Sequence, residues 1–290
     1  FPDGIEDAVQ QLLTRLDQSM STYKPDSELN NLNRIAVGEE LSVSADLWQV
    51  LQGAQHIYAL TLGAFDPTVG PLVDLWGFGP QDTGDEVPSE LEINALLPKV
   101  NFGQLRLAGD NKVTKLAAID LDLSAIAKGY AAQQVATLLR TQGFSNFLVE
   151  VGGELQVAGH NRKGLPWRIA IEVPNLLHGG VEQVIAVTDS GVATSGDYRN
   201  YFERDGVRYS HTIDPRTGQP VTHNLASVTV LADTAGVADA LATAFMVMGT
   251  EKTLELAAQR DIPVYLLVKT DEGFQASHSE AFKPYIKGAE

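Results

Sequence analysis

Residues 119–130 read Ile119-Asp120-Leu121-Asp122-Leu123-Ser124-Ala125-Ile126-Ala127-Lys128-Gly129-Tyr130, and this stretch indicates the fold class. Apolar residues alternate with aspartates over its first five positions, which is typical of a strand with one buried face. A helix is expected from Ser124 or Ala125 to Leu139, and Gly143 closes it. A strand is therefore expected to lead directly into a helix, with an acid at the junction.

Further strands are expected on both sides of this stretch. Apolar residues alternate over 147–151 and again over 155–157, with Gly152-Gly153 as the turn, which predicts a hairpin. Because the strands come in hairpin-like groups separated by helices, without strict βαβ alternation, the sequence favours an α+β fold. We expect largely antiparallel strands in hairpins with packed helices. The remaining expected strands are 105–107, 167–173, 184–188, 207–213, 226–232 and 262–269.

Three further helices are expected from apolar residues at three- and four-residue spacing, over residues 5–21, 44–60 and 236–248. The first ends before Pro25, because proline cannot continue a helix. Ser42 or Ser44 is the expected N-cap of the second. Residues 63–79 are expected to form a loop. We expect a single domain over residues 1–290, with a subdivision near residue 100 as the alternative.

The composition describes an acidic globular protein. Of 290 residues, 44% are apolar and 20% charged, and the formal net charge is −16. Nucleic-acid phosphates need clustered Lys and Arg, so this charge argues against a nucleic-acid partner. A phosphate-bearing ligand is compatible with it if a cation supplies positive charge. The chain has no cysteine, which excludes disulfides and a cysteine nucleophile. No apolar run is long enough for a transmembrane segment.

Two segments place acids beside glycines or a helix start. In Gly63 to Pro71, Asp66 precedes a proline and is held extended, and the glycines let a ligand approach the backbone. The alternative is a rigid turn in which Asp66 accepts local amide hydrogen bonds. Lys128 lies in the first turn of its helix, where the helix end attracts anions. The alternative there is that Asp122 caps the helix and Lys128 is solvated.

Hydroxyl and acid groups surround a histidine. Residues 194–198 read Thr-Ser-Gly-Asp-Tyr, and residues 209–218 carry His211 on an expected strand, three positions before Asp214. This density of polar groups makes His211 a candidate for proton transfer. The alternative is a structural histidine whose ring nitrogens are satisfied by its neighbours.

An acid and a hydroxyl share one face of the helix expected over 236–248. Asp239 and Thr243 are four residues apart in an otherwise apolar stretch. Burying a carboxylate is unfavourable unless something compensates its charge. Mg²⁺ would do so at a sparse oxygen site when substrate phosphates and water complete its shell. The alternatives are a hydrogen bond from Thr243 to Asp239, and an acid that stabilises the helix dipole.

The chain contains seven motifs in a fixed order: Ser-Thr-Tyr…Asp-Ser-Glu-Leu-Asn (21–30), Gly-Ala-Phe-Asp-Pro-Thr-Val-Gly-Pro (63–71), Asp-Leu-x-x-Ile-Ala-Lys-Gly-Tyr (122–130), Val-Gly-Gly-Glu (151–154), Thr-Ser-Gly-Asp-Tyr (194–198), His-x-Ile-Asp-Pro-x-Thr-Gly-x-Pro (211–220) and Ala-Asp-Ala-Leu-Ala-Thr-Ala (238–244). In this order they resemble the ApbE family, the FAD:protein FMN transferases, over nearly the whole chain. Each motif alone is weak, and the seven together are highly specific. Gln133 stands where the family commonly has an aspartate, and Ser124-Ala125 where Gly-Gly is frequent.

The resemblance implies an α+β enzyme that binds FAD, uses Mg²⁺ and transfers FMN to a threonine or serine of a target flavoprotein, releasing AMP. By resemblance, the contacts to FAD fall on Tyr23, Ala64, Phe65, Asp66, Asp122, Lys128 and Ile213. The implied metal ligands are Asp239, Thr243 and the carbonyls of Ala125 and Ala242. His211 matches the family histidine near the scissile phosphates and is the expected base, with Asp214 orienting it.

Two alternatives share this expected site. Water as the acceptor would make the chain a pyrophosphatase that cuts FAD to FMN and AMP, and a non-catalytic flavin carrier would bind FAD without cutting it. The resemblance also implies a periplasmic protein, anchored at the inner membrane as a lipoprotein. The lipidated cysteine, and a strand that precedes the first helix in the family, are expected upstream of Phe1.

Overall fold

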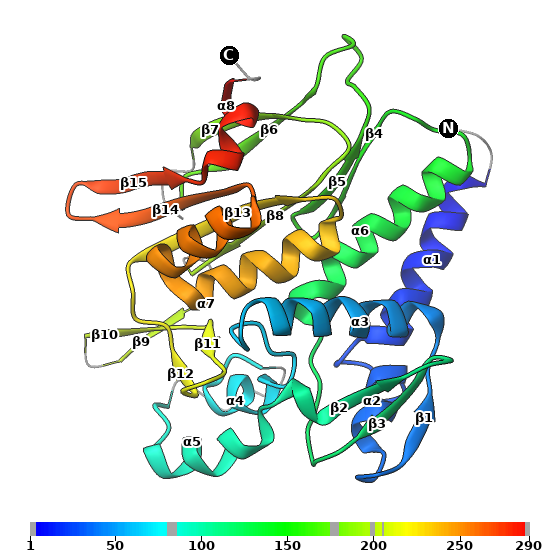
Figure 1. Cartoon of the computed structure of the whole chain (residues 1–290), viewed down its shortest axis with the longest axis vertical. Coiled ribbons are helices and arrows are strands. Elements are labelled where there is room, and N and C mark those ends of the chain that lie inside the picture. Colours follow the sequence, from blue (N-terminus) through cyan, green and yellow to red (C-terminus); the bar gives the residue numbers. More distant parts are fainter. Residues whose placement is uncertain (1–3, 80–85, 175–179, 198–200, 205, 288–290) are drawn as a thin grey trace. The chain divides into compact units, whose positions relative to one another are not determined.

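The computed structural model describes residues 4–79, 86–174, 180–197, 201–204 and 206–287 (Figure 1). The chain divides into two compact units, Phe1–Ala127 with Phe202–Val221, and Lys128–Tyr201 with Thr222–Glu290. The expected single domain, with its alternative subdivision near residue 100, stays a prediction. Tyr198, the last residue of the Thr-Ser-Gly-Asp-Tyr motif, lies outside the described residues.

The first unit is mainly helical and contains short antiparallel strand pairs. Its three-stranded sheet has the order β1-β3-β2, and β11 pairs antiparallel with β12. Its hydrophobic core includes a cluster of Leu72, Trp76, Ile93, Phe202 and Ile213. Its elements are α1 (Ile5–Met20), α2 (Glu28–Arg34), β1 (Glu40–Ser42), α3 (Ala45–Leu60), α4 (Gly70–Leu75), α5 (Glu90–Leu96), the 3-10 turns η1 (Leu97–Lys99) and η2 (Phe102–Gln104), β2 (Leu105–Ala108), β3 (Lys112–Lys115), β9 (Tyr201–Arg204), which begins at the unit boundary, β10 (Val207–Ser210), β11 (Ile213–Asp214) and β12 (Gln219–Pro220).

The second unit is built on a six-stranded antiparallel sheet with the order β15-β14-β13-β8-β5-β4. The long helix α7 packs on β8 and β13, and a separate hairpin pairs β6 with β7 (Figure 1). The elements are β4 (Phe147–Val151), β5 (Glu154–Ala158), β6 (Trp167–Glu172), β7 (Val181–Val187), β8 (Gly191–Gly196), β13 (Leu225–Ala232), α7 (Ala235–Arg260), β14 (Val264–Thr270), β15 (Gly273–His278), η3 (Glu280–Phe282) and α8 (Lys283–Lys287). Helix α6 (Ser124–Thr141) runs through the boundary between the units.

The predicted α+β class is confirmed, as is the hairpin around Gly152-Gly153, where Val151 pairs with Glu154. The N-cap of α3 is Ser44, whose side chain accepts a hydrogen bond from the backbone N–H of Leu47. No helix of the described residues has the length and apolar character needed to cross a bilayer.

The strand predicted over Ile119–Leu123 is wrong. Ile119, Leu121 and Leu123 are buried in alternation, as predicted, but no neighbouring strand pairs with them among the described residues. The side chain of Asn33 pairs with Leu121 instead, accepting from its N–H at 2.8 Å and donating to its carbonyl at 3.0 Å. Alternation reports burial of one face, and it does not reveal which group satisfies the backbone.

Other segments also differ in extent from the expected ones, among them β7, which begins three residues before the strand expected over 184–188. The loop expected over 63–79 contains α4, whose first turn includes a proline. The strand expected over 207–213 is divided into β10 and β11. The helix expected over 236–248 does end at a break, at Gly249, where φ is 76° and ψ is 175°, and a second helical segment then continues α7 to Arg260.

The break in α7 is stabilised by side chains that replace lost helical hydrogen bonds. The ring Nε2 of His223 lies 2.8 Å from the carbonyl oxygen of Met246, and the hydroxyl of Thr253 donates to the carbonyl of Phe245 at 3.1 Å. Carbonyls in the turn before a break lose their i+4 donors, so these contacts satisfy them. The carbonyls at the end of the first segment of α7 therefore keep hydrogen-bond partners despite the break.

Glycine 129 sets the separation between α6 and α7. A Cβ at this position would lie 2.2 Å from the carbonyl oxygen of Ala235 and 2.8 Å from the Cβ of Asp239. Only a glycine therefore lets the two helices pack this closely.

We expect Gly129→Ala to lower stability by about 1–3 kcal/mol, because the added methyl overpacks the contact between the helices. Thermal unfolding followed by circular dichroism measures the change. Gly109→Ala is the matched control, since a Cβ there meets nothing within 4 Å. Equal effects of the two substitutions would contradict the close packing of α6 on α7.

Candidate functional site

The start of α7 is fixed by residues of its own unit. The side chain of Thr234 caps the helix by accepting from the N–H of Val237. The amide of Gln156 on β5 accepts from the N–H of Ala235 at 2.7 Å and donates to the carbonyl of Asp233 at 3.3 Å. These hydrogen bonds hold the first turn of α7 against the sheet, and Asp239 follows in the next turn.

Asp239 is buried, with 3% of its surface exposed, and contacts two residues of α6. Its Oδ2 accepts from the N–H of Gly129 at 3.0 Å, and its Oδ1 lies 3.5 Å from Nζ of Lys128. The same Nζ lies 2.9 Å from Oε1 of Glu154, at the start of β5. We call Lys128, Glu154 and Asp239 the lysine–carboxylate cluster.

The lysine–carboxylate cluster carries more negative than positive charge. Its two carboxylates share one ammonium group, and Oε2 of Glu154 is buried without a hydrogen-bond partner among the described residues. Buried carboxylates without full compensation favour binding a proton or a cation. One negative charge of the cluster is therefore uncompensated, and its carboxylate oxygens have unused lone pairs, so the cluster can bind one more cation or proton.

The pKa values of the lysine–carboxylate cluster reflect this imbalance. Burial raises the pKa of Asp239, although Lys128 and the N–H of Gly129 oppose the shift. Burial and the charge of Asp239 raise the pKa of Glu154 to about 7, although Lys128 lowers it. Burial lowers the pKa of Lys128, but Asp239 and Glu154 together outweigh it and the pKa is raised. Lys128 is therefore held as a cation.

The other predicted metal ligands on α7 lie one turn further on. Thr243 is half-buried, and its hydroxyl lies 3.3 Å from that of Ser195 on β8, while Ala242 is buried. Over the described chain no group of three or more His, Cys, Asp or Glu side chains is placed to hold a metal ion. An ion here would need backbone, hydroxyl, water or substrate oxygens, and the ligand roles of Asp239, Thr243, Ala242 and Ala125 stay predictions.

The predicted FAD contacts of the first unit have local structural partners. Asp66 accepts from the N–H and hydroxyl of Thr68 at 2.8 Å and 2.6 Å, and from the N–H of Phe102 at 3.2 Å. Asp122 accepts from the N–H of Ser124 at 2.8 Å, at the start of α6. The alternatives of a local turn and a helix cap are thus present in the structure. Tyr23 is 77% exposed, whereas Ala64, Phe65 and Ile213 are buried; their contacts to FAD stay predictions.

The candidate proton-transfer residue lies between β10 and β11. His211 is half-buried, and its ring makes an edge contact with Phe78 at a centroid distance of 6.2 Å. Asp214 forms a two-point ion pair with Arg216, at 2.8 Å from Nε to Oδ1 and 2.7 Å from Nη2 to Oδ2. Asp214 thus has a structural role in its turn, and its predicted orientation of His211 stays a prediction.

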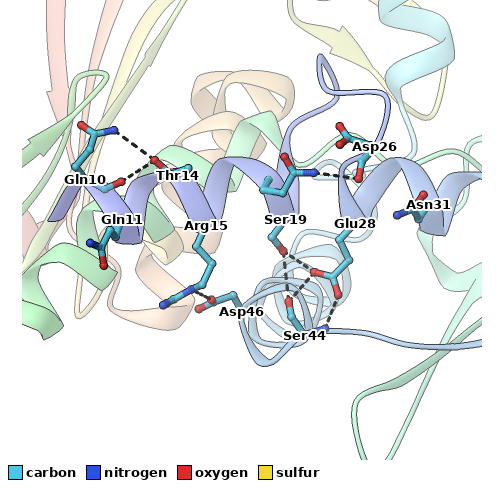
Figure 2. Close-up of a pocket in the computed structure, with 11 residues that line it drawn as sticks. Gln10, Gln11, Thr14, Arg15, Ser19, Asp26, Glu28, Asn31, Ser44 and Asp46 are labelled. Carbon is cyan, nitrogen blue, oxygen red and sulfur yellow. Dashed lines mark hydrogen bonds and ion pairs between the residues drawn. The ribbon is translucent and has the colours of Figure 1, made fainter. Parts of the chain in front are cut away.

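A cleft of about 680 Å³ lies in the first unit beside α1 (Figure 2). None of the predicted site residues lines it. Glu28 accepts from the hydroxyls of Ser19 and Ser44 at 2.7 Å and 2.6 Å, and Arg15 pairs with Asp46 at 2.9 Å (Figure 2). These groups satisfy one another and join α1 to the starts of α2 and α3.

The fold and the lysine–carboxylate cluster define an α+β protein that presents acid and hydroxyl oxygens on one helix and a lysine on its neighbour. The chain belongs to the ApbE family, whose sequence model matches residues 2–266. It is 45% identical to the FAD:protein FMN transferase of Vibrio cholerae over 97% of this chain and 84% of that protein. It is 40% identical to the FAD:protein FMN transferase of Escherichia coli K12, over 97% of this chain and 82% of that protein.

Solved structures agree with these relatives. The flavin transferase ApbE from Vibrio cholerae superposes with a TM-score of 0.90 at 44% identity, over 98% of this chain and 91% of that chain. The apo form of Pseudomonas stutzeri flavinyl transferase ApbE superposes with a TM-score of 0.90 at 39% identity, over 99% of this chain and 89% of that chain. The fold of the family therefore extends over nearly the whole chain.

Glu154 is the site residue that sequence reasoning missed. It belongs to the Val-Gly-Gly-Glu motif, but no functional role was predicted for it from the sequence. Its 5% exposure and its ion pair with Lys128 place it in the lysine–carboxylate cluster. An acid directly after a hairpin turn, at a position where the strand faces inward, was the available signal.

Glu154 predicts a pH dependence of stability. Its ordinary pKa of 4.5 applies in the unfolded chain, and its pKa in the folded protein is about 7. Between these pH values the folded state binds more protons, so this glutamate makes stability fall as pH rises. We expect Glu154→Gln to reduce the fall in Tm between about pH 5 and pH 8, measured in EDTA.

Glu150→Gln is the matched control, because it removes the same charge from an exposed position on the adjacent strand β4. It should leave the pH profile of Tm unchanged. If Tm of Glu154→Gln changes with pH in parallel with that of the wild type, the pKa of Glu154 is not raised in the folded protein.

Proposed function

We infer that this chain is an enzyme, an FAD:protein FMN transferase, which moves the FMN part of FAD onto target proteins. The observation that carries this inference is membership of the ApbE family over residues 2–266, together with relatives named FAD:protein FMN transferase at 40–45% identity. The lysine–carboxylate cluster supports it, because it offers positive and negative groups suited to a metal–phosphate ligand.

The finer proposal is transfer to a hydroxyl of the target. The oxygen of a threonine or serine attacks the FMN phosphorus, the bond from that phosphorus to the oxygen of the AMP phosphate breaks, and AMP leaves with the bond electrons. The hydroxyl proton passes to a base. Reactions of this type depend mainly on positioning and on neutralising phosphate charge.

Mg²⁺ fits the residues of α7. Asp239 offers a buried carboxylate whose charge is not fully compensated, and Thr243 offers a hydroxyl one turn later. The Ala242 carbonyl, and that of Ala125 in α6, would be the backbone ligands. When bound, Mg²⁺ supplies the positive charge that stabilises phosphate oxygens in an acidic protein.

Lys128 and His211 have separate proposed roles. Lys128 is held as a cation by Glu154 and Asp239, so it can pair with a phosphate oxygen of FAD. His211 would accept the proton of the incoming hydroxyl. Hydrolysis of FAD differs only in the acceptor, and a flavin carrier would release no AMP. Incubation with FAD, with and without a flavoprotein target, distinguishes the three by protein-bound flavin and AMP.

The proposed location is the periplasm, with a lipid anchor upstream of Phe1. It is supported only by resemblance to the exported members of the family. Fractionation of cells that express the full gene, followed by detection of the protein, tests it.

We expect Asp239→Asn to lower FMN transfer in Mg²⁺ by about 100-fold or more, because the metal–phosphate contact supplies several kcal/mol of the transition-state stabilisation. Mass analysis of a flavoprotein target after incubation with FAD and Mg²⁺ measures transfer. Asp261→Asn is the control, since it removes one charge from the exposed C-terminal end of the same helix. Full activity of Asp239→Asn would discard the metal assignment.

We expect His211→Ala to lose transfer while it retains FAD, because it removes a base without removing the proposed phosphate contacts. Retained FAD is measured by fluorescence and transfer by the mass of the target. His56→Ala, at an exposed position of α3, is the control. Unchanged transfer by His211→Ala would remove the histidine from the reaction.

A further inference from the structure

Leu62 adopts a backbone conformation that suits few residues. Its φ is 51°, in the left-handed region that side chains disfavour. The other non-glycine residues with positive φ in the described chain are aspartates and one asparagine, the types that tolerate this region best: Asp110, Asn111, Asp189 and Asp261. A leucine is the exception among them.

The conformation follows from the end of α3. The N–H of Gly63 donates to the carbonyl of Tyr58 at 2.9 Å, and the N–H of Leu62 lies 3.4 Å from the carbonyl of Ala59. This is the Schellman arrangement, in which the position held by Leu62 is usually a glycine. A leucine there strains the backbone relative to glycine.

Packing does not compensate for this strain. The side chain of Leu62 is 85% exposed, so it buries almost no apolar surface. A strained residue that contributes little to folding is expected where the side chain has another use. Stability therefore gives no reason for a leucine at this position.

The turn also fixes where the side chain stands. The hydroxyl of Thr61 donates to the carbonyl of Ile57 at 2.7 Å and accepts from the N–H of Phe65 at 3.2 Å. These bonds tie the helix end to the segment Ala64–Asp66, which is buried and which the family resemblance predicts to contact FAD. Leu62 is thus an exposed apolar side chain held two residues from that segment.

We propose that the side chain of Leu62 covers one face of a ring system of bound FAD. FAD carries two flat ring systems with apolar faces, and an aliphatic side chain on a backbone that a turn already fixes covers such a face without the cost of ordering that backbone on binding. The inference rests on the proposed function, because it uses the FAD contact that the family resemblance predicts at Ala64–Asp66.

The test compares Leu62→Gly and Leu62→Asn with wild type. Both variants relieve the backbone strain and remove the apolar side chain, so Tm should stay level or rise by up to about 3 °C. Affinity for FAD in Mg²⁺, from FAD fluorescence titration, should fall about tenfold. Leu62→Met keeps an apolar side chain and should bind FAD within about twofold of wild type.

Leu91→Ala is the matched control, because Leu91 is 81% exposed on α5 in ordinary helical geometry. It should leave FAD affinity unchanged. Wild-type affinity in both Leu62→Gly and Leu62→Asn would overturn the proposal, as would a fall in Tm for both. An unchanged FAD affinity with a raised KM for the target protein would assign Leu62 to the target and also overturn it. Wild-type protein that binds no FAD would instead defeat the proposed function itself.

Discussion

Burial of the Asp239 carboxylate constrains the whole second unit. A charge with 3% exposure needs partners in fixed positions, and these come from α6 through Lys128 and the N–H of Gly129. The N–H is within reach only because residue 129 has no side chain. Gln156 of the sheet in turn holds the start of α7. The sheet, both helices and the acid therefore depend on one another.

The spacing of apolar residues, together with turn and cap residues, predicted the helices and hairpins in which buried positions recur regularly. The hairpin at Gly152-Gly153 and the start of α3 at Ser44 follow from turn and capping chemistry, which is local. The segment Ile119–Leu123 was wrongly predicted as a strand. Its backbone is hydrogen-bonded at Leu121 by the side chain of Asn33, 88 residues away, and not by a neighbouring strand. The predicted helix end at residue 248 coincides with the break at Gly249, but the second segment of α7 up to Arg260 was not predicted, because contacts of His223 and Thr253 stabilise the chain across the break.

The site was predictable where a motif carried it. Lys128 and Asp239 were singled out from the sequence, and the structure brings them to 3.5 Å of each other across two helices. Glu154 escaped because its role arises only when β5 pairs within the sheet and meets α6. Asp214 shows the converse: its pairing with Arg216, two residues away, is local and could have been read from the sequence. Long-range pairing is what single-sequence reasoning lacks.

The contact at Gly129 also has a mechanical consequence. Two helices whose backbones touch cannot slide or tilt past one another without a steric clash, so α6 and α7 behave as one stiff body where they meet. The carboxylate and the lysine are consequently preorganised, and little reorganisation energy is spent on aligning them when a charged ligand arrives. The Lys128 side chain is 45% exposed even though its Nζ pairs with Glu154 and Asp239, so a charged ligand can reach this residue from solvent without moving either helix.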